Sequence, residues 1–126
     1  MGHKILVVDD EDGVRRLIGR VLRQAGHEIL EALDGRDIFK TIRTQRPDLI
    51  LLDVHMPQLD GIEALSEIRE IEPRIPVIIM TGDGNSERAQ LAMERGACDY
   101  LTKPIDMDYM LSSVTAHLLI QSKEGR

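Results

Sequence analysis

Short runs of apolar residues alternate along the chain with segments of helical periodicity. Three of the runs, at residues 5–8, 49–52 and 77–80, are continuous and end at polar or turn residues. Continuous runs of this length predict strands that are buried on both faces, as in a parallel sheet covered by helices. Two more polar runs, at residues 28–32 and 99–102, predict strands at the edges of the sheet.

Each run is followed by a segment in which apolar residues recur every three or four positions, the spacing of a helix with one buried face. The five stripes are Val14, Leu17, Ile18, Val21, Leu22 and Ala25; Ile38, Phe39 and Ile42; Ala64, Leu65, Ile68 and Ile71; Ala89, Ala92 and Met93; and Met107, Met110, Leu111, Val114 and Leu118. Gly26 is typical of a helix end, and Asp34 and Asp106 are typical N-caps. Leu119 and Ile120 lie off the stripe of the last helix.

Five strand–helix pairs in succession predict an α/β protein with right-handed crossovers. The expected fold is a flavodoxin-like (βα)5 doubly wound parallel sheet with strand order 2-1-3-4-5, because the second and fifth strands read as edges. The first and third strands then lie side by side at the topological switch point, where ligands of open sheets bind. The 126 residues are expected to form one domain, with a core at about 4–121 and a polar C-terminal tail that frays at 122–126.

Composition excludes several classes of function. The chain has no Trp, and Phe39, Tyr100 and Tyr109 are its aromatic residues, so a site that stacks bases is not expected. A net charge of −6 argues against nucleic acid as a direct partner. Cys98, the single cysteine, cannot form an internal disulfide, which favours a reducing compartment. There is no signal-peptide pattern and no apolar run near the roughly 20 residues that cross a bilayer, so a cytoplasmic domain without membrane contact is expected.

Polar side chains follow four of the five predicted strands. They are Asp9 and Asp10 after the first, Asp53 at the third, Thr81-Gly82 at the fourth and Lys103-Pro104 at the fifth. Each motif by itself has a simpler interpretation as a helix cap, a turn, a strand exit or a surface lysine. In a parallel sheet, however, all four meet at one edge. Three carboxylates packed there would repel one another, and a hard oxygen-ligated ion such as Mg²⁺ would compensate their charge.

This set of groups is suited to holding a phosphoryl group on Asp53. A carboxylate can attack phosphorus and form an acyl phosphate. The Thr81 hydroxyl can donate to a phosphoryl oxygen, and the Lys103 ammonium can neutralise charge on the transferring group. The side chain of His55 is interpreted as a rim residue, whereas its backbone carbonyl is a candidate metal ligand. The Lys103–Pro104 bond tolerates either isomer, and the sequence leaves the choice open.

Together these motifs resemble the receiver domain of bacterial two-component response regulators, from about Lys4 to Gln121. The residues that carry the resemblance are 6–11 (LVVDDE), 53–57 (DVHMP) with 60–61 (DG), 81–82 (TG) and 96–104 (GACDYLTKP). The resemblance implies that a phosphohistidine on a sensor histidine kinase or phosphotransfer protein phosphorylates Asp53. It implies that Asp10, Asp53 and the carbonyl of His55 hold Mg²⁺, with Asp9 acting mostly through water.

The resemblance also implies a switch. Thr81 and Lys103 would grip the phosphoryl oxygens, and Tyr100 matches the family's switch aromatic, which turns inward when Thr81 moves. The surface of the fourth helix, fifth strand and fifth helix would then control a downstream protein or an output domain outside this sequence, or form a homodimer. The chain would be no enzyme beyond its own phosphorylation and dephosphorylation. His55 and Asp83 occupy positions that vary in the family and tune the lifetime of the phosphoryl group.

Three alternatives differ in class. A receiver that binds partners without phosphorylation is disfavoured because Asp10, Asp53, Thr81 and Lys103 are all present. A Mg²⁺-dependent aspartyl phosphatase of the haloacid dehalogenase type carries a second Asp two residues after its nucleophile, where this chain has His55. A flavin-binding electron carrier of the same fold needs a Ser/Thr/Gly-rich loop after the first strand, but residues 9–12 (DDED) would repel phosphate.

Overall fold

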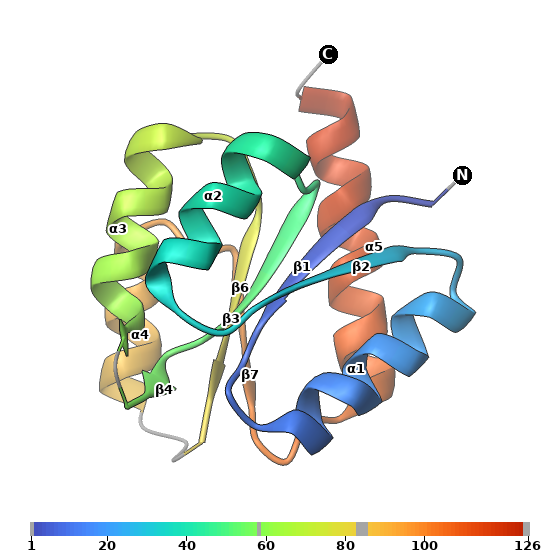
Figure 1. Cartoon of the computed structure of the whole chain (residues 1–126), viewed down its shortest axis with the longest axis horizontal. Helices are drawn as coiled ribbons and strands as arrows, with labels where there is room; N and C mark the ends of the chain where they lie inside the picture. Colours follow the sequence, from blue (N-terminus) through green and yellow to red (C-terminus); the bar gives the residue numbers. More distant parts are fainter. Residues whose placement is uncertain (1, 58, 83–85, 125–126) are drawn as a thin grey trace.

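The computed structural model describes residues 2–57, 59–82 and 86–124. Figure 1 shows a twisted five-stranded sheet with helices on both of its faces. The strands are β1 (Lys4–Val8), β2 (Glu28–Ala32), β3 (Leu49–Asp53), β6 (Val77–Thr81) and β7 (Asp99–Thr102). All neighbouring pairs are parallel, and the order is β2-β1-β3-β6-β7. This is the predicted flavodoxin-like arrangement, with β1 and β3 adjacent at the switch point.

Five helices form the outer layers. They are α1 (Asp12–Gln24), α2 (Gly35–Gln45), α3 (Gly61–Ile71), α4 (Ser86–Glu94) and α5 (Met107–Glu124). Helices α1 and α5 pack against each other on one face of the sheet, and α2, α3 and α4 cover the other (Figure 1). Crossovers that put helices on both faces leave no solvated side to the central strands, which is why their sequences read as continuous apolar runs.

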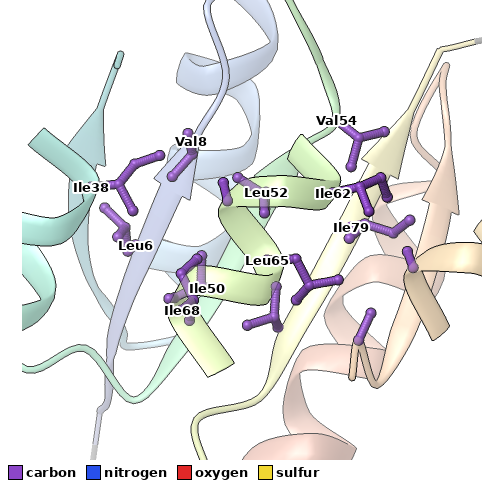
Figure 2. Close-up of a cluster of buried hydrophobic side chains, with 14 of the residues drawn as sticks. Leu6, Val8, Ile38, Ile50, Leu52, Val54, Ile62, Leu65, Ile68 and Ile79 are labelled. Atoms are coloured by element: carbon purple, nitrogen blue, oxygen red, sulfur yellow. The ribbon is translucent and has the colours of Figure 1, made fainter. Parts of the chain in front are cut away.

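Successive residues of the central strands belong to two separate cores. Leu6, Val8, Ile50 and Leu52 pack with α2, α3 and α4, as Figure 2 shows. The residues between them, such as Val7, pack with α1 and α5 on the opposite face. Both sets are fully buried. The two cores follow from the two-residue period of a strand, which sends alternate side chains to opposite faces.

Local signals in the sequence set several helix ends as expected. The Asp34 carboxylate accepts the backbone N–H of Asp37 at 2.9 Å, and Asp106 accepts the N–H groups of Asp108 (3.0 Å) and Tyr109 (3.1 Å). These bonds satisfy amides that have no partner within the helix. Gly26 has a φ of +96°, in the region that a residue with a side chain rarely adopts, and it follows the end of α1.

Some expectations were wrong in detail. Leu17, Ile71 and Met93 lie on the predicted apolar stripes, but their exposed fractions are 45%, 44% and 40%. Helix α5 extends to Glu124. As expected, Leu119 and Ile120 are exposed, at 59% and 50%. No helix in the described parts of the chain is long and apolar enough to span a membrane.

The segment after β3 forms a small hairpin that the apolar pattern does not predict. Strand β4 (His55–Met56) pairs antiparallel with β5 (Leu59–Asp60), and His55 lies opposite Asp60. Asp60 then caps α3 by accepting the N–H groups of Ile62 (2.9 Å) and Glu63 (3.3 Å). The chain thus leaves Asp53, turns back on itself and enters α3 within a few residues.

Gly61 is the residue that permits this tight return. A Cβ atom placed on Gly61 would lie 2.4 Å from the Cα of Val54, a backbone atom that cannot move aside without shifting the chain next to Asp53. A Cβ atom placed on Gly13, in the first turn of α1, would meet no other atom within 4 Å. A side chain is therefore sterically excluded at Gly61, whereas the space around Gly13 could hold one.

We expect Gly61→Ala to lower the free energy of unfolding by about 3 kcal/mol, because the new methyl group overlaps backbone. Gly13→Ala is the matched control and should raise it by about 0.5–1 kcal/mol, since alanine is the better helix former. Urea unfolding followed by circular dichroism measures both. Equal stabilities of the two variants would contradict the close approach of α3 to Val54.

Candidate functional site

The polar residues at the strand ends converge as predicted. Asp9 and Asp10 follow β1, Asp53 ends the adjacent β3, and one carboxylate oxygen from each of the three lies within 4.8 Å of the others. Asp9 and Asp53 are buried, at 0% and 1% exposure, whereas Asp10 is exposed. Two of the three carboxylates are thus buried, and the third is exposed to solvent.

Lys103 reaches into this acidic group from the end of β7. Its ammonium nitrogen lies 2.9 Å from Asp9 Oδ2 and 3.2 Å from Asp53 Oδ2. A third carboxylate, Glu11, lies 2.9 Å from the same nitrogen. The backbone N–H of Lys103 also donates to the carbonyl of Thr81 at 2.8 Å, which joins the end of β7 to the end of β6. The sequence analysis did not identify Glu11 as a site residue; its position directly after Asp9 and Asp10 was the available signal.

Short-range hydrogen bonds hold the two buried carboxylates in place. Asp9 Oδ1 accepts the N–H of Glu11, and Asp53 Oδ1 accepts the N–H of His55, each at 2.9 Å. Both are bonds from an Asp to the amide two residues later, a local geometry that Asp readily forms. Each carboxylate therefore has one oxygen held by backbone and the other, Oδ2, directed at Lys103.

The charges at the site shift the pKa values of its members. Burial raises the pKa of Asp53, and the neighbouring Asp9 raises it further, while the amide of His55 and the ammonium of Lys103 oppose the shift. Burial alone would lower the pKa of Lys103, but its close contacts with the Glu11 and Asp9 carboxylates and the nearby charge of Asp53 outweigh burial and raise it. Lys103 therefore holds its proton firmly, and Asp53 loses its proton less readily than an exposed aspartate does.

The same residues fit a divalent cation. The three aspartates offer hard oxygen ligands, which Mg²⁺ prefers. Asp9 and Asp53 are buried, whereas Asp10 is exposed, so water can reach this side of the group. Asp9 Oδ2 is buried and lacks a well-directed hydrogen bond, and its close contact with Lys103 is ionic. An atom of this kind is a suitable acceptor for a metal-bound water.

Thr81 lies at the end of β6 and is 1% exposed. Its hydroxyl oxygen is 3.0 Å from Nε2 of His55, which belongs to β4. The sequence analysis interpreted the His55 side chain as a rim residue, so this contact was missed. No pattern in the sequence indicates it, because it depends on the hairpin that turns β4 back toward β6.

Tyr100 is predicted to be the switch aromatic, and it is 44% exposed on the edge strand β7. Its backbone N–H donates to Asp99 Oδ1 at 2.8 Å, and the hydroxyl of Tyr109 on α5 donates to Asp99 Oδ2 at 2.8 Å. The Tyr100 side chain is thus largely open to solvent, and its neighbour Asp99 is bonded to α5. Asp83, the second residue expected to tune the site, lies outside the described residues.

Two remaining questions from the sequence are also answered. The Lys103–Pro104 peptide bond is cis. Cys98 is half-buried, and burial raises the pKa of its thiol to about 11, so the thiol is protonated at neutral pH and is a poor nucleophile.

Comparison with known proteins identifies the family. The pattern of the response regulator receiver domain matches residues 5–115. The chain belongs to this family. Receiver domains are signalling domains that work with histidine kinases and output domains, and they generally bind Mg²⁺ at an acidic pocket.

Curated relatives differ in how much of their length the chain covers. It is 42% identical over 120 residues to regulatory protein AtoC of Escherichia coli, and it spans 26% of that protein. It is 38% identical over 122 residues to sporulation initiation phosphotransferase F of Bacillus subtilis and spans 98% of it. Among solved structures, a CheY-like response regulator receiver domain protein of Methanospirillum hungatei superposes with a TM-score of 0.91 at 26% identity, covering 98% of this chain and 99% of that one.

We expect Asp53→Asn to raise the free energy of unfolding at pH 7 by on the order of 1 kcal/mol in the absence of Mg²⁺. The folded-state pKa of Asp53 lies above its unfolded value, so the folded state is favoured by protonation at low pH and loses that contribution as the pH rises through the folded pKa. The gain from the substitution should therefore shrink as the pH falls toward the ordinary Asp value of 3.8.

The measurement is urea unfolding at several pH values with EDTA present. Asp108→Asn is the control, because Asp108 is exposed in the first turn of α5, away from the acidic group. An Asp53→Asn variant that is less stable than the wild type at pH 7 would show that the Lys103 contact outweighs the repulsion among the carboxylates.

Proposed function

We propose that residues 1–126 act as one phosphoacceptor receiver domain in which Asp53 takes a phosphoryl group from a partner kinase or phosphotransfer protein in an Mg²⁺-dependent reaction. The observation that carries this proposal is the position of Asp53. Its carboxylate is buried at the carboxyl end of β3, beside Asp9 and Asp10, with one oxygen held by a backbone amide and the other 3.2 Å from Lys103.

The chemistry is a transfer between two nucleophiles. An oxygen of Asp53 attacks the phosphorus of a phosphohistidine, the P–N bond breaks, and its electron pair returns to the partner's imidazole. The product on this chain is an acyl phosphate. Asp10, Asp53 and the carbonyl of His55 would hold Mg²⁺, with Asp9 acting through water, and the ion would neutralise charge on the phosphoryl oxygens.

Lys103 changes partners in this scheme. Before transfer its ammonium contacts three carboxylates, including the exposed Glu11. A phosphoryl group on Asp53 offers more negative charge at the same place, so Lys103 would keep its position and exchange Glu11 for a phosphoryl oxygen. The backbone N–H of Lys103 donates to the carbonyl of Thr81 at 2.8 Å, which ties the base of this side chain to the end of β6.

The output follows from Thr81 and Tyr100. We infer that Thr81 and the amide of Gly82 move toward the phosphoryl group, that Tyr100 turns inward, and that the surface of α4, β7 and α5 changes shape. Tyr100 and Tyr109 are 44% and 51% exposed on this surface in the present structure. Such a switch requires the phosphoryl group to favour one arrangement energetically and not merely to bind.

The receiver of this chain would act on a downstream protein or on an output domain in the same polypeptide. Its relatives include both a protein of which the chain spans 26% and one of which it spans 98%. A homodimer through α4, β7 and α5 is a further proposed assembly. Beyond phosphorylation and dephosphorylation of its own Asp53, we propose no catalytic activity.

The deciding experiment is intact-mass spectrometry after incubation with Mg²⁺ and acetyl phosphate, a small-molecule phosphoryl donor. We expect the mass of one phosphoryl group, stable in acid and labile in base, because an acyl phosphate hydrolyses readily in alkali. The adduct should be absent when EDTA replaces Mg²⁺.

Asp53→Asn is the control for the position of the adduct, and it preserves the shape of the side chain and the acceptor for the His55 amide. A wild-type chain that gains no mass at low temperature, although Mg²⁺ binding is confirmed, would instead support a receiver that binds partners without phosphorylation. An adduct that persists in Asp53→Asn would place the phosphoryl group elsewhere.

A further inference from the structure

The contact between His55 and Thr81 is unexplained by the roles given to the site so far. Nε2 of His55 lies 3.0 Å from the hydroxyl oxygen of Thr81, whose side chain is buried at the end of β6. Within the described residues, the Asp53 oxygens contact the His55 amide and the Lys103 ammonium. The Thr81 hydroxyl oxygen is thus within hydrogen-bond distance of the imidazole.

The backbone of His55 is held from two sides, which fixes the point from which its imidazole extends. Its N–H donates to Asp53 Oδ1 at 2.9 Å, and the residue pairs with Asp60 across the β4–β5 hairpin. The same local turn that positions the Asp53 carboxylate thus also positions the imidazole over Thr81. A side chain on such a base can act on Thr81 without being part of the phosphoryl-transfer chemistry.

A hydroxyl has one proton to donate, and a phosphoryl oxygen can only accept. To bond a phosphoryl group on Asp53, the Thr81 hydroxyl must turn its proton toward Asp53 and move away from His55. The bond to Nε2 competes with this change when Nε2 is its acceptor, that is, when the proton of the neutral imidazole is on Nδ1, and the bond is then lost. A contact that exists in only one of two states shifts the equilibrium toward that state.

We propose that His55 is a positioning residue that holds Thr81 in its unphosphorylated orientation and so opposes the switch. This inference rests on the proposed function of Asp53 and Thr81 and adds a chain-specific restraint to it. His55 and Thr81 each have at least one further interaction. The proposed restraint comes from the geometry of the bond between them and does not require that bond to be their sole contact. The carbonyl of His55, the candidate metal ligand, is unaffected by changes to the side chain.

The test is a double-mutant cycle on His55 and Thr81, read as the affinity for beryllofluoride, a phosphoryl mimic, with Mg²⁺ in excess. The chain has no Trp, so intrinsic fluorescence reports Tyr100 and Tyr109. We expect His55→Ala to bind the mimic about fivefold more tightly than the wild type, the equivalent of about 1 kcal/mol for one neutral hydrogen bond. In a Thr81→Ala background the same change should have little effect, because the bond is already gone.

Two further variants separate positioning from a general structural role. His55→Gln can place its amide oxygen, an acceptor, near the position of Nε2 and should restore an affinity close to that of the wild type. His27→Ala, at the opposite end of the sheet, should leave the affinity unchanged.

An effect of His55→Ala that is equally large with and without Thr81 would overturn the proposal, since His55 would then act on access to Asp53. No effect in either background would overturn it as well. If the wild type binds no mimic, the proposed function fails, and nitrogen-15 NMR of the imidazole in the unliganded protein decides the inference separately. A His55 ring whose Nε2 resonance is identical in the wild type and Thr81→Ala would exclude the hydrogen bond.

Discussion

The contact of one ammonium group with three carboxylates holds the strand ends of this protein together. Lys103 comes from β7, Asp53 from β3, and Asp9 and Glu11 from the turn after β1, so a single side chain links three parts of the sheet edge. Parallel strands have no turns to join their carboxyl ends, and a short buried ion pair can take over that role only if its hydrogen bonds are satisfied. Here backbone amides donate to one oxygen of Asp9 and one of Asp53, while Lys103 contacts the other oxygen of each. The geometry of this edge of the sheet depends on both sets of interactions.

The same arrangement carries an electrostatic cost. Two buried carboxylates and two exposed ones face a single cation, and burial together with Asp9 raises the pKa of Asp53. A protein selected for stability alone would not retain such a group, since removing like charges from a buried position is generally stabilising. Under the proposed function, this excess negative charge would favour a divalent cation among the carboxylates, so the charge that lowers stability would serve the chemistry.

The hairpin of β4 and β5 links the chemistry to the neighbouring elements. It begins directly after Asp53, places His55 against Thr81, and ends at Asp60, whose carboxylate caps α3 and lies 3.4 Å from Arg88 of α4. Gly61 allows the return because no side chain fits there. The hairpin thus connects the neighbourhood of Asp53 to β6, α3 and α4. Thr81 itself is restrained by His55 of the hairpin and by the bond that its carbonyl accepts from the Lys103 N–H.

The fold class, the strand order and the convergence of the polar residues at one edge of the sheet could all be predicted from the amino-acid sequence. Runs such as 5–8 and 49–52 are apolar at every position because both faces of the central strands are buried, and the polar residues that end them meet because the strands are parallel. N-caps such as Asp34 and Asp106 were also predictable, since a cap is a bond between residues two or three apart. The folded structure was needed to show that Glu11 shares Lys103, that His55 contacts Thr81 and that Leu17 faces solvent. These outcomes depend on how elements distant in the sequence approach one another, and side-chain contacts of that kind leave no periodic signal in the chain.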